Sequence, residues 1–207
     1  MSIPMILTWT RIAMIPVLVT TLYLPDGMLN SRAAQIVAAG IVVVCSITDW
    51  LDGYLARTMR QTSAFGAFLD PVADKLLVAT TLVVLVHMDR LHPVVCVLII
   101  GREIAVSALR EWMAQLGKSK SVSVATLGKI KTTCQMIAIP FLLCNFKLFG
   151  NVTTVHVGTL LIWAAAVLTL WSMVVYMKAA HAANAAPVSA VGIKIAPKPA
   201  VQASRVA

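Results

Sequence analysis

Apolar residues occur along this chain in long runs that short polar stretches separate. The runs predict six helices, at about residues 1–24, 32–57, 65–88, 93–116, 127–149 and 153–177. A helix of ~20 apolar residues is long enough to cross the hydrocarbon core of a bilayer. The pattern therefore predicts an all-α membrane protein with six transmembrane helices, and we find no internal repeat in it.

The composition supports a membrane class. Of the 207 residues, 59% are hydrophobic, and the mean hydropathy of +0.88 is far above that of a soluble domain. The net charge of +9 would suit a nucleic-acid partner, but the basic residues gather in particular loops, as a topology signal does. The four cysteines lie in apolar runs without metal-type spacing, so we expect them to be packing residues.

The distribution of basic residues predicts the orientation in the membrane. Eleven lysines and arginines fall on one side of the predicted spans and three on the other, which places both termini in the cytoplasm. The same count places the end of the second helix and the start of the third in the cytoplasm. We expect one membrane domain over residues 1–180 and a disordered cytoplasmic tail, rich in Ala, Pro and Val, over residues 181–207.

Half of the acidic residues are concentrated in one short stretch. Of eight, four lie within 26 positions: Asp49, Asp52, Asp70 and Asp74. The first pair is spaced i,i+3 and the second i,i+4, so each pair shares one face of its helix. Carboxylates at membrane depth are costly and mark functional sites by default. Two such helix ends at one membrane surface would bring four carboxylates together.

Metal ions are the natural counter-charge for such a group. Carboxylate oxygens suit Mg²⁺, which usually also binds substrate phosphates, and two ions about 4 Å apart can clamp the attacking and leaving oxygens of a displacement at phosphorus. Gly53 and Ala56 leave room for a bulky ligand, and Arg57 and Arg60 suit a diphosphate. The alternative, that the aspartates only pair with Arg57 and Lys75, is disfavoured because these cations are too few.

The stretch D-x2-D-G-x2-A-R-x8-G-x3-D-x3-D resembles the signature of the CDP-alcohol phosphatidyltransferase family. Every fixed position is present: Asp49, Asp52, Gly53, Ala56, Arg57, Gly66, Asp70 and Asp74. The resemblance implies six membrane helices around a polar cavity that opens to the cytoplasm, usually in a homodimer. It also implies transfer of a phosphatidyl-type group from a CDP-linked donor to an alcohol, with release of CMP.

The resemblance also implies roles for residues. Asp49, Asp52 and Asp70 would bind one Mg²⁺, and Asp49, Asp70 and Asp74 a second, with Mn²⁺ as a possible replacement. Asp74 would be the general base. Residues implied to contact CDP-diacylglycerol are Gly53, Arg57, Ser63, Thr8 and Arg11. The N-terminal family pattern N-x-P-N/T-x-L-T-x-x-R is kept at Pro4, Leu7, Thr8 and Arg11, while Ser2 and Met5 depart from it.

Two further segments resemble bacterial phosphatidylglycerophosphate synthases within this family. They read R-E-I-A-V-S-A-L-R-E-W at residues 102–112 and L-G-K-I-K-T-T-C-Q-M at residues 127–136. The implied acceptor is sn-glycerol 3-phosphate, whose phosphate needs a cationic cradle. We expect Arg110 and Lys131 to form it, with Arg102 and Lys129 next. The alternatives are that the lysines only signal topology and that the charges of the fourth helix pair with one another.

Two other functions remain open at this point. One is the same transfer to another phosphorylated acceptor, such as inositol phosphate. The other is a cation transporter that uses the aspartates as an ion pathway. The transporter is disfavoured because the carboxylates are predicted at one membrane face rather than at the midplane, and because the inverted repeats common among transporters are missing from the sequence.

Overall fold

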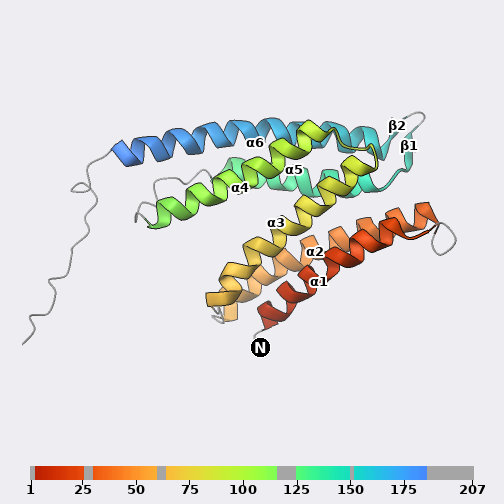
Figure 1. Ribbon diagram of the computed structural model, residues 1–207, viewed down its shortest axis with the longest axis horizontal. Coiled ribbons are helices and arrows are strands. Elements are labelled where there is room, and N and C mark those ends of the chain that lie inside the picture. Colours follow the sequence, from red (N-terminus) through yellow and green to blue (C-terminus); the bar gives the residue numbers. More distant parts are fainter. Residues whose placement is uncertain (1–2, 26–29, 60–63, 116–124, 150–151, 186–207) are drawn as a thin grey trace, which may run out of the picture.

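A computed structural model describes residues 3–25, 30–59, 64–115, 125–149 and 152–185. These residues form six helices and a two-stranded hairpin (Figure 1). In order they are α1 (Ile3–Tyr23), α2 (Ser31–Met59), α3 (Ala64–His87), α4 (Pro93–Gln115), α5 (Ala125–Leu143), β1 (Lys147–Phe149), β2 (Val152–Thr153) and α6 (Thr154–Ala185). The helical class is confirmed, and each of the six predicted helices is present.

Three of the helices contain a segment that is long and apolar enough to cross a membrane. These segments are Met5–Tyr23 in α1, Ser31–Asp49 in α2 and Thr154–Lys178 in α6, judged on the described residues. The other three helices also contain ionisable residues. For α3, α4 and α5 the membrane-spanning assignment therefore stays a prediction.

The predicted end of the fifth helix is wrong. We expected the helix to continue to residue 149, but α5 ends at Leu143 and residues 147–149 form β1, which pairs antiparallel with β2. The reason is that distant residues bind the backbone at this point. Arg90 donates hydrogen bonds to the carbonyl oxygens of Leu142, at 3.0 Å, and of Leu143. The Thr154 hydroxyl donates to the carbonyl of Cys144. Carbonyls at a helix end need such partners.

The last helix is longer than expected. We predicted an end near residue 177, whereas α6 continues to Ala185. At 1.5 Å per residue its 32 residues span ~48 Å, more than the ~30 Å of the hydrocarbon core. Residues 181–185 of the predicted tail are thus helical. The predicted disorder of residues 186–207 lies outside the described residues.

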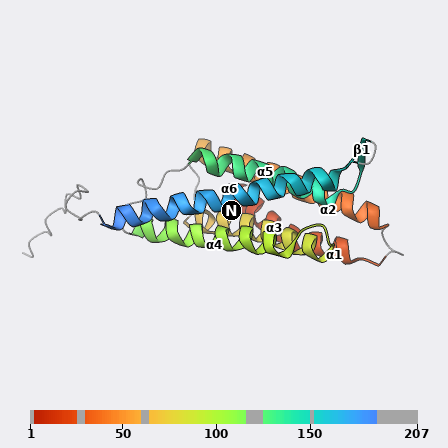
Figure 2. The same cartoon turned by 90° about the horizontal axis from the view of Figure 1, so that it is seen from above.

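The helices pack so that the ends carrying the aspartates meet. α1 packs on both α2 and α3, α2 packs on α5, and α4 and α5 pack on α6. Figures 1 and 2 show the N-terminal end of α1, the C-terminal end of α2 and the N-terminal end of α3 at one end of the bundle. The two aspartate pairs therefore belong to the same end, as the sequence predicts.

The core lies where these helices cross, and large apolar side chains also cover the outside. Buried residues at the centre include Leu18, Val42, Leu82, Ile99 and Leu142, and they form one contiguous cluster. Cys45 and Cys96 belong to this cluster and Cys144 packs against it, which confirms their predicted packing role. The outer faces expose large apolar side chains such as Val97, Leu160, Val167 and Trp171. An exposed apolar exterior of this kind suits contact with lipid.

Gly158 permits the close approach of α5 and α6. A Cβ added at Gly158 would lie 2.8 Å from Cγ of Leu142 and 3.0 Å from its backbone nitrogen. We expect Gly158→Ala to lower the stability of the detergent-solubilised protein by about 1–3 kcal/mol, since overpacking forces the helices apart. The measurement is the thermal unfolding midpoint.

The matched control for this variant is Gly101→Ala. Gly101 is also helical, but a Cβ there meets nothing within 4 Å. Alanine favours the helix more than glycine, so this variant should unfold at the same or a slightly higher temperature. Equal midpoints for the two variants would contradict the close-approach explanation.

Candidate active site

Helix α1 holds the aspartates of both neighbouring helices. Thr8 and Arg11 lie one turn apart on α1 and are both buried. The Thr8 hydroxyl donates a hydrogen bond to Oδ1 of Asp70 on α3. Nη1 of Arg11 lies 3.0 Å from Oδ1 of Asp49 on α2. The first helix therefore connects the acidic ends of α2 and α3.

Asp74 completes this group from the next turn of α3. Its carboxylate is partly buried and lies within electrostatic range of Asp49, Arg11 and Glu103. The structure thus brings Asp49, Asp70 and Asp74 to one end of the bundle, with Arg11 among them. The Asp49 side chain remains 44% exposed, so it is still accessible to a ligand.

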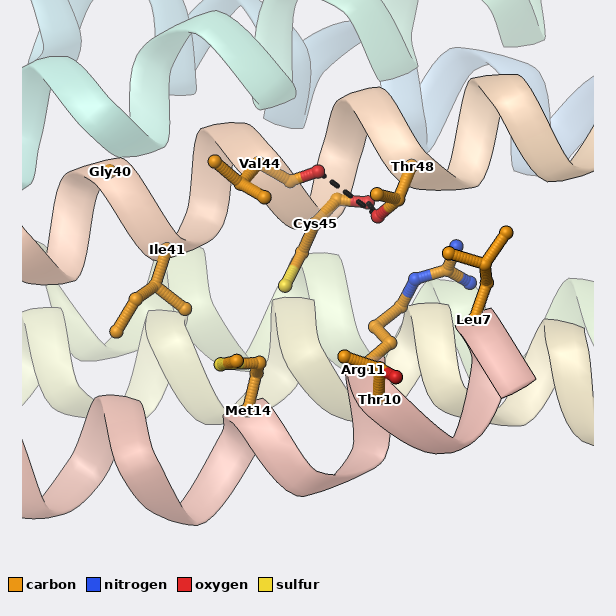
Figure 3. Close-up of a pocket in the computed structure, with 9 residues that line it drawn as sticks. All are labelled: Leu7, Thr10, Arg11, Met14, Gly40, Ile41, Val44, Cys45 and Thr48. Atoms are coloured by element: carbon orange, nitrogen blue, oxygen red, sulfur yellow. Dashed lines mark hydrogen bonds between the residues drawn. The ribbon is translucent and has the colours of Figure 1, made fainter.

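A cavity of about 290 Å³ lies beside this group, between α1 and α2 (Figure 3). Its lining is mostly apolar and consists of Leu7, Thr10, Arg11, Met14, Gly40, Ile41, Val44, Cys45 and Thr48. Arg11, which lines the cavity, is also the residue that pairs with Asp49. The cavity therefore joins a charged group at one end to an apolar lining, which suits a ligand with a polar head and an apolar chain.

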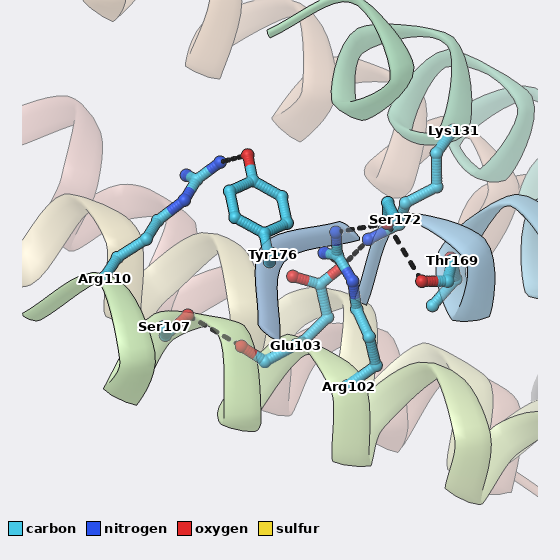
Figure 4. Close-up of polar contacts among 8 residues, drawn as sticks. All are labelled: Arg102, Glu103, Ser107, Arg110, Lys131, Thr169, Ser172 and Tyr176. Carbon is cyan, nitrogen blue, oxygen red and sulfur yellow. Dashed lines mark hydrogen bonds and ion pairs between the residues drawn. The ribbon is translucent and has the colours of Figure 1, made fainter. Parts of the chain in front are cut away.

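A second polar group lies between α4, α5 and α6 (Figure 4). Nζ of Lys131 on α5 donates to Oε1 of Glu103 on α4, and Arg102 lies 3.6 Å from the same oxygen. Lys131 and Arg102 are both buried. Arg110 lies within electrostatic range of both. Two cations thus lie at one carboxylate, and a third cation lies near them.

Helix α6 holds the two arginines from the other side. Nη2 of Arg102 donates to the Ser172 hydroxyl at 2.7 Å. Nη2 of Arg110 donates to the Tyr176 hydroxyl, and its guanidinium lies 5.1 Å from the centre of the Tyr176 ring. The buried Nε of Arg102 has no hydrogen-bond partner among the described residues. This group therefore has the charge, and at Arg102 the donor, to bind an anion.

The chain matches the CDP-alcohol phosphatidyltransferase family over residues 1–171. It belongs to this family. A CDP-diacylglycerol–glycerol-3-phosphate 3-phosphatidyltransferase of Salmonella choleraesuis (strain SC-B67) is 47% identical over 182 residues, which cover 87% of this chain and 95% of the relative. Relatives with the same name from Shigella flexneri serotype 5b (strain 8401) and Escherichia coli (strain K12) are each 46% identical over 183 residues, 87% of this chain and 96% of their own length.

Divalent metal ions are generally used by CDP-alcohol phosphatidyltransferases, and the type of side chain here suits them. Asp49, Asp70 and Asp74 offer only oxygen ligands, which hard cations prefer. Among the side chains that the structure describes, no group of three or more acidic, histidine or cysteine residues is close enough to hold an ion. Asp52, the fourth predicted ligand, is not among these side chains.

Several other predicted site residues cannot be placed in the same way. For Gly53, Arg57 and Lys129 only the helical backbone is described, and Ser63 lies outside the described residues altogether. The predicted roles of these residues stay predictions.

The contribution of α6 to this phosphatidyltransferase was not predicted from the sequence. We treated that helix only as an apolar span, yet Ser172 and Tyr176 hold the two arginines. A signal was available, since these two hydroxyl residues are spaced i,i+4 and share one face. What the sequence does not show is that this face turns toward α4 rather than toward lipid.

Proposed function

We propose that the protein transfers the phosphatidyl group of CDP-diacylglycerol to sn-glycerol 3-phosphate, giving phosphatidylglycerophosphate and CMP. The observation that carries this proposal is the cationic group on α4 and α5. Glu103, which pairs with Lys131 of this group, lies within electrostatic range of Asp74. A site for a phosphorylated acceptor therefore adjoins the acidic site. The identity of 46–47% to enzymes that carry this name, over 95–96% of their length, supports the same acceptor.

The acidic site provides the reacting end. Asp49, Asp52, Asp70 and Asp74 would hold two divalent ions, Mg²⁺ or Mn²⁺. Such ions offset the charge of the diphosphate and stabilise the CMP leaving group. Asp74 takes the proton of the acceptor hydroxyl, whose oxygen forms a bond to the lipid-linked phosphorus while the bond from that phosphorus to CMP breaks. Thr8 and Arg11 keep two of the carboxylates in place.

The donor lipid enters from the side of α1 and α2. Gly53, Arg57 and Ser63 are our candidates for contacts with its CDP group, and Thr8 and Arg11 for contacts at the acidic end. The apolar cavity between α1 and α2 accommodates the beginning of an acyl chain, because its lining is apolar and Arg11 stands next to the carboxylates. The remainder of the chains stays in the bilayer.

The acceptor phosphate binds on the opposite side, between α4, α5 and α6. Arg110 and Lys131 are the principal ligands, followed by Arg102 and Lys129. Guanidinium groups suit phosphate because they donate two parallel hydrogen bonds. The hydroxyls of Ser172 and Tyr176 limit the motion of the two arginines. An acceptor without a phosphate, such as serine, would leave this group of cations without a role.

The protein is an integral membrane protein with apolar helices and bacterial relatives. We propose that it resides in the bacterial inner membrane, with both termini and the active site in the cytoplasm, where nucleotides and Mg²⁺ are found. We also propose a homodimer, as the family resemblance implies.

Release of CMP from CDP-diacylglycerol by the purified protein tests the reaction. We expect release only when a divalent ion and sn-glycerol 3-phosphate are both present, because the acceptor hydroxyl is the nucleophile. Inositol phosphate and serine serve as alternative acceptors in the same assay. Faster release with inositol phosphate would change the acceptor, and a complete lack of release would favour an ion-transport function.

Asp70→Asn tests the acidic site. The amide keeps the shape of the side chain and an oxygen that accepts from Thr8, but loses the charge that a metal ion needs. We expect turnover to be abolished with the thermal unfolding midpoint preserved. Asp89→Asn is the matched control, because Asp89 is exposed between α3 and α4. Its φ of 54° is also one that asparagine tolerates. Near-normal turnover of Asp70→Asn would defeat the two-metal scheme.

Arg110→Ala tests the acceptor site. We expect the KM for sn-glycerol 3-phosphate to rise about 10- to 100-fold, as for the loss of a hydrogen bond to a charged group. The KM for CDP-diacylglycerol should change little. Arg32→Ala, which removes an exposed arginine at the start of α2, is the control and should leave both values unchanged. Equal effects of Arg110→Ala on both substrates would remove its assigned role.

A further inference from the structure

A carboxylate stands in the middle of the site that we assign to an anion. Glu103 accepts the hydrogen bond of Lys131 and lies 3.6 Å from Arg102 (Figure 4). Both cations are among the residues proposed to bind the acceptor phosphate. A carboxylate in this place repels a phosphate, so its presence needs an explanation that the transfer reaction alone does not give.

We propose that Glu103 is a built-in counter-ion of the acceptor site. It pairs with Lys131 and Arg102 between turnovers and thereby lowers the affinity of the site for every phosphate. This inference rests on the proposed function, because it assumes that the acceptor phosphate binds to these cations. Glu103 is a positioning residue, since it acts on the acceptor through Lys131 and Arg102.

Burial explains why the empty site needs an anion. The side chain of Lys131 is only 3% exposed and that of Arg102 only 7%. Charges removed from water are costly unless a partner compensates them. Glu103 is 26% exposed, so it is more accessible than either of these two cations. It can therefore turn away when another anion takes its place.

The balance of charge fits a phosphate monoester. Arg102, Arg110 and Lys131 carry three positive charges and Glu103 one negative charge, so the group has a net charge of +2. A phosphate monoester carries about −1.5 to −2 at neutral pH. The site with Glu103 is thus matched to one phosphate, whereas the site without it would have an excess of positive charge.

A lowered affinity has a use because the product also carries a phosphate. Phosphatidylglycerophosphate keeps the phosphate monoester of its acceptor, and inorganic phosphate has the same chemistry. A site with these three cations, two of them buried, and no carboxylate would retain both. Since Glu103 competes for the same cations, it favours the release of the product.

Glu103→Gln tests the proposal, because the amide keeps the size of the side chain and can still accept from Lys131. We expect the KM for sn-glycerol 3-phosphate to fall about fivefold, an order of magnitude set by the loss of one nearby like charge. The KM for CDP-diacylglycerol should stay unchanged. Inorganic phosphate should inhibit the variant more strongly by a similar factor. Glu111→Gln, which removes the same charge from an exposed position on the same helix, is the control and should behave as the wild type.

Two further variants keep the test decisive. Glu103→Ala removes the charge and the hydrogen bond and should lower the same KM, whereas Glu103→Asp retains the charge and should not. An increase in the KM for sn-glycerol 3-phosphate in Glu103→Gln, or an equal change for both substrates, would overturn the proposal. Failure of both neutral variants to fold would also overturn it, since Glu103 would then be a structural residue. Wild-type CMP release in the same assay tests the proposed function separately.

Discussion

The structure depends on one constraint, namely that a charged side chain inside an apolar bundle must have a partner of opposite charge or a hydrogen-bonding group. Several of the described charges meet this constraint across helices. Arg11 of α1 pairs with Asp49 of α2, and Lys131 of α5 pairs with Glu103 of α4. Arg102 of α4 binds Ser172 of α6. Because each pair joins two helices, these pairs also help to hold the neighbouring helices together.

These pairs separate into two groups, to which we have assigned the two halves of the proposed transfer reaction. The group on α1, α2 and α3 is acidic and adjoins an apolar cavity, whereas the group on α4, α5 and α6 is basic. Glu103 belongs to the basic group yet lies within electrostatic range of Asp74. An anionic lipid donor and an anionic acceptor repel one another in water. In the function that we propose, the carboxylates hold metal ions for the donor and the cations bind the acceptor, so the protein can bring the two together.

The opposite end of the bundle follows the same constraint for a structural purpose. Arg90 is one of three basic residues on the side that the charge count assigns to the exterior. Its guanidinium binds the last carbonyls of α5, and burial lowers the pKa of Arg90 from its ordinary value. An arginine keeps its charge even so, because its ordinary pKa is very high. The role of this basic residue is thus to bind the carbonyls at the end of α5, and its position does not need to be explained by membrane topology.

The aspartate signature, the helical class and the resemblance to the family were all readable from the residues alone, because they depend on spacing within a helix and on composition. Spacing of i,i+3 and i,i+4 fixes which side chains share a face, whatever surrounds that helix. The end of α5 at Leu143 could not be read in this way, since Arg90 and Thr154 lie far from it in the chain. The partners of Thr8, Arg110 and Lys131 could not be predicted from the sequence either. Which face of one helix meets another is decided by the packing of the whole bundle, and local sequence does not record it.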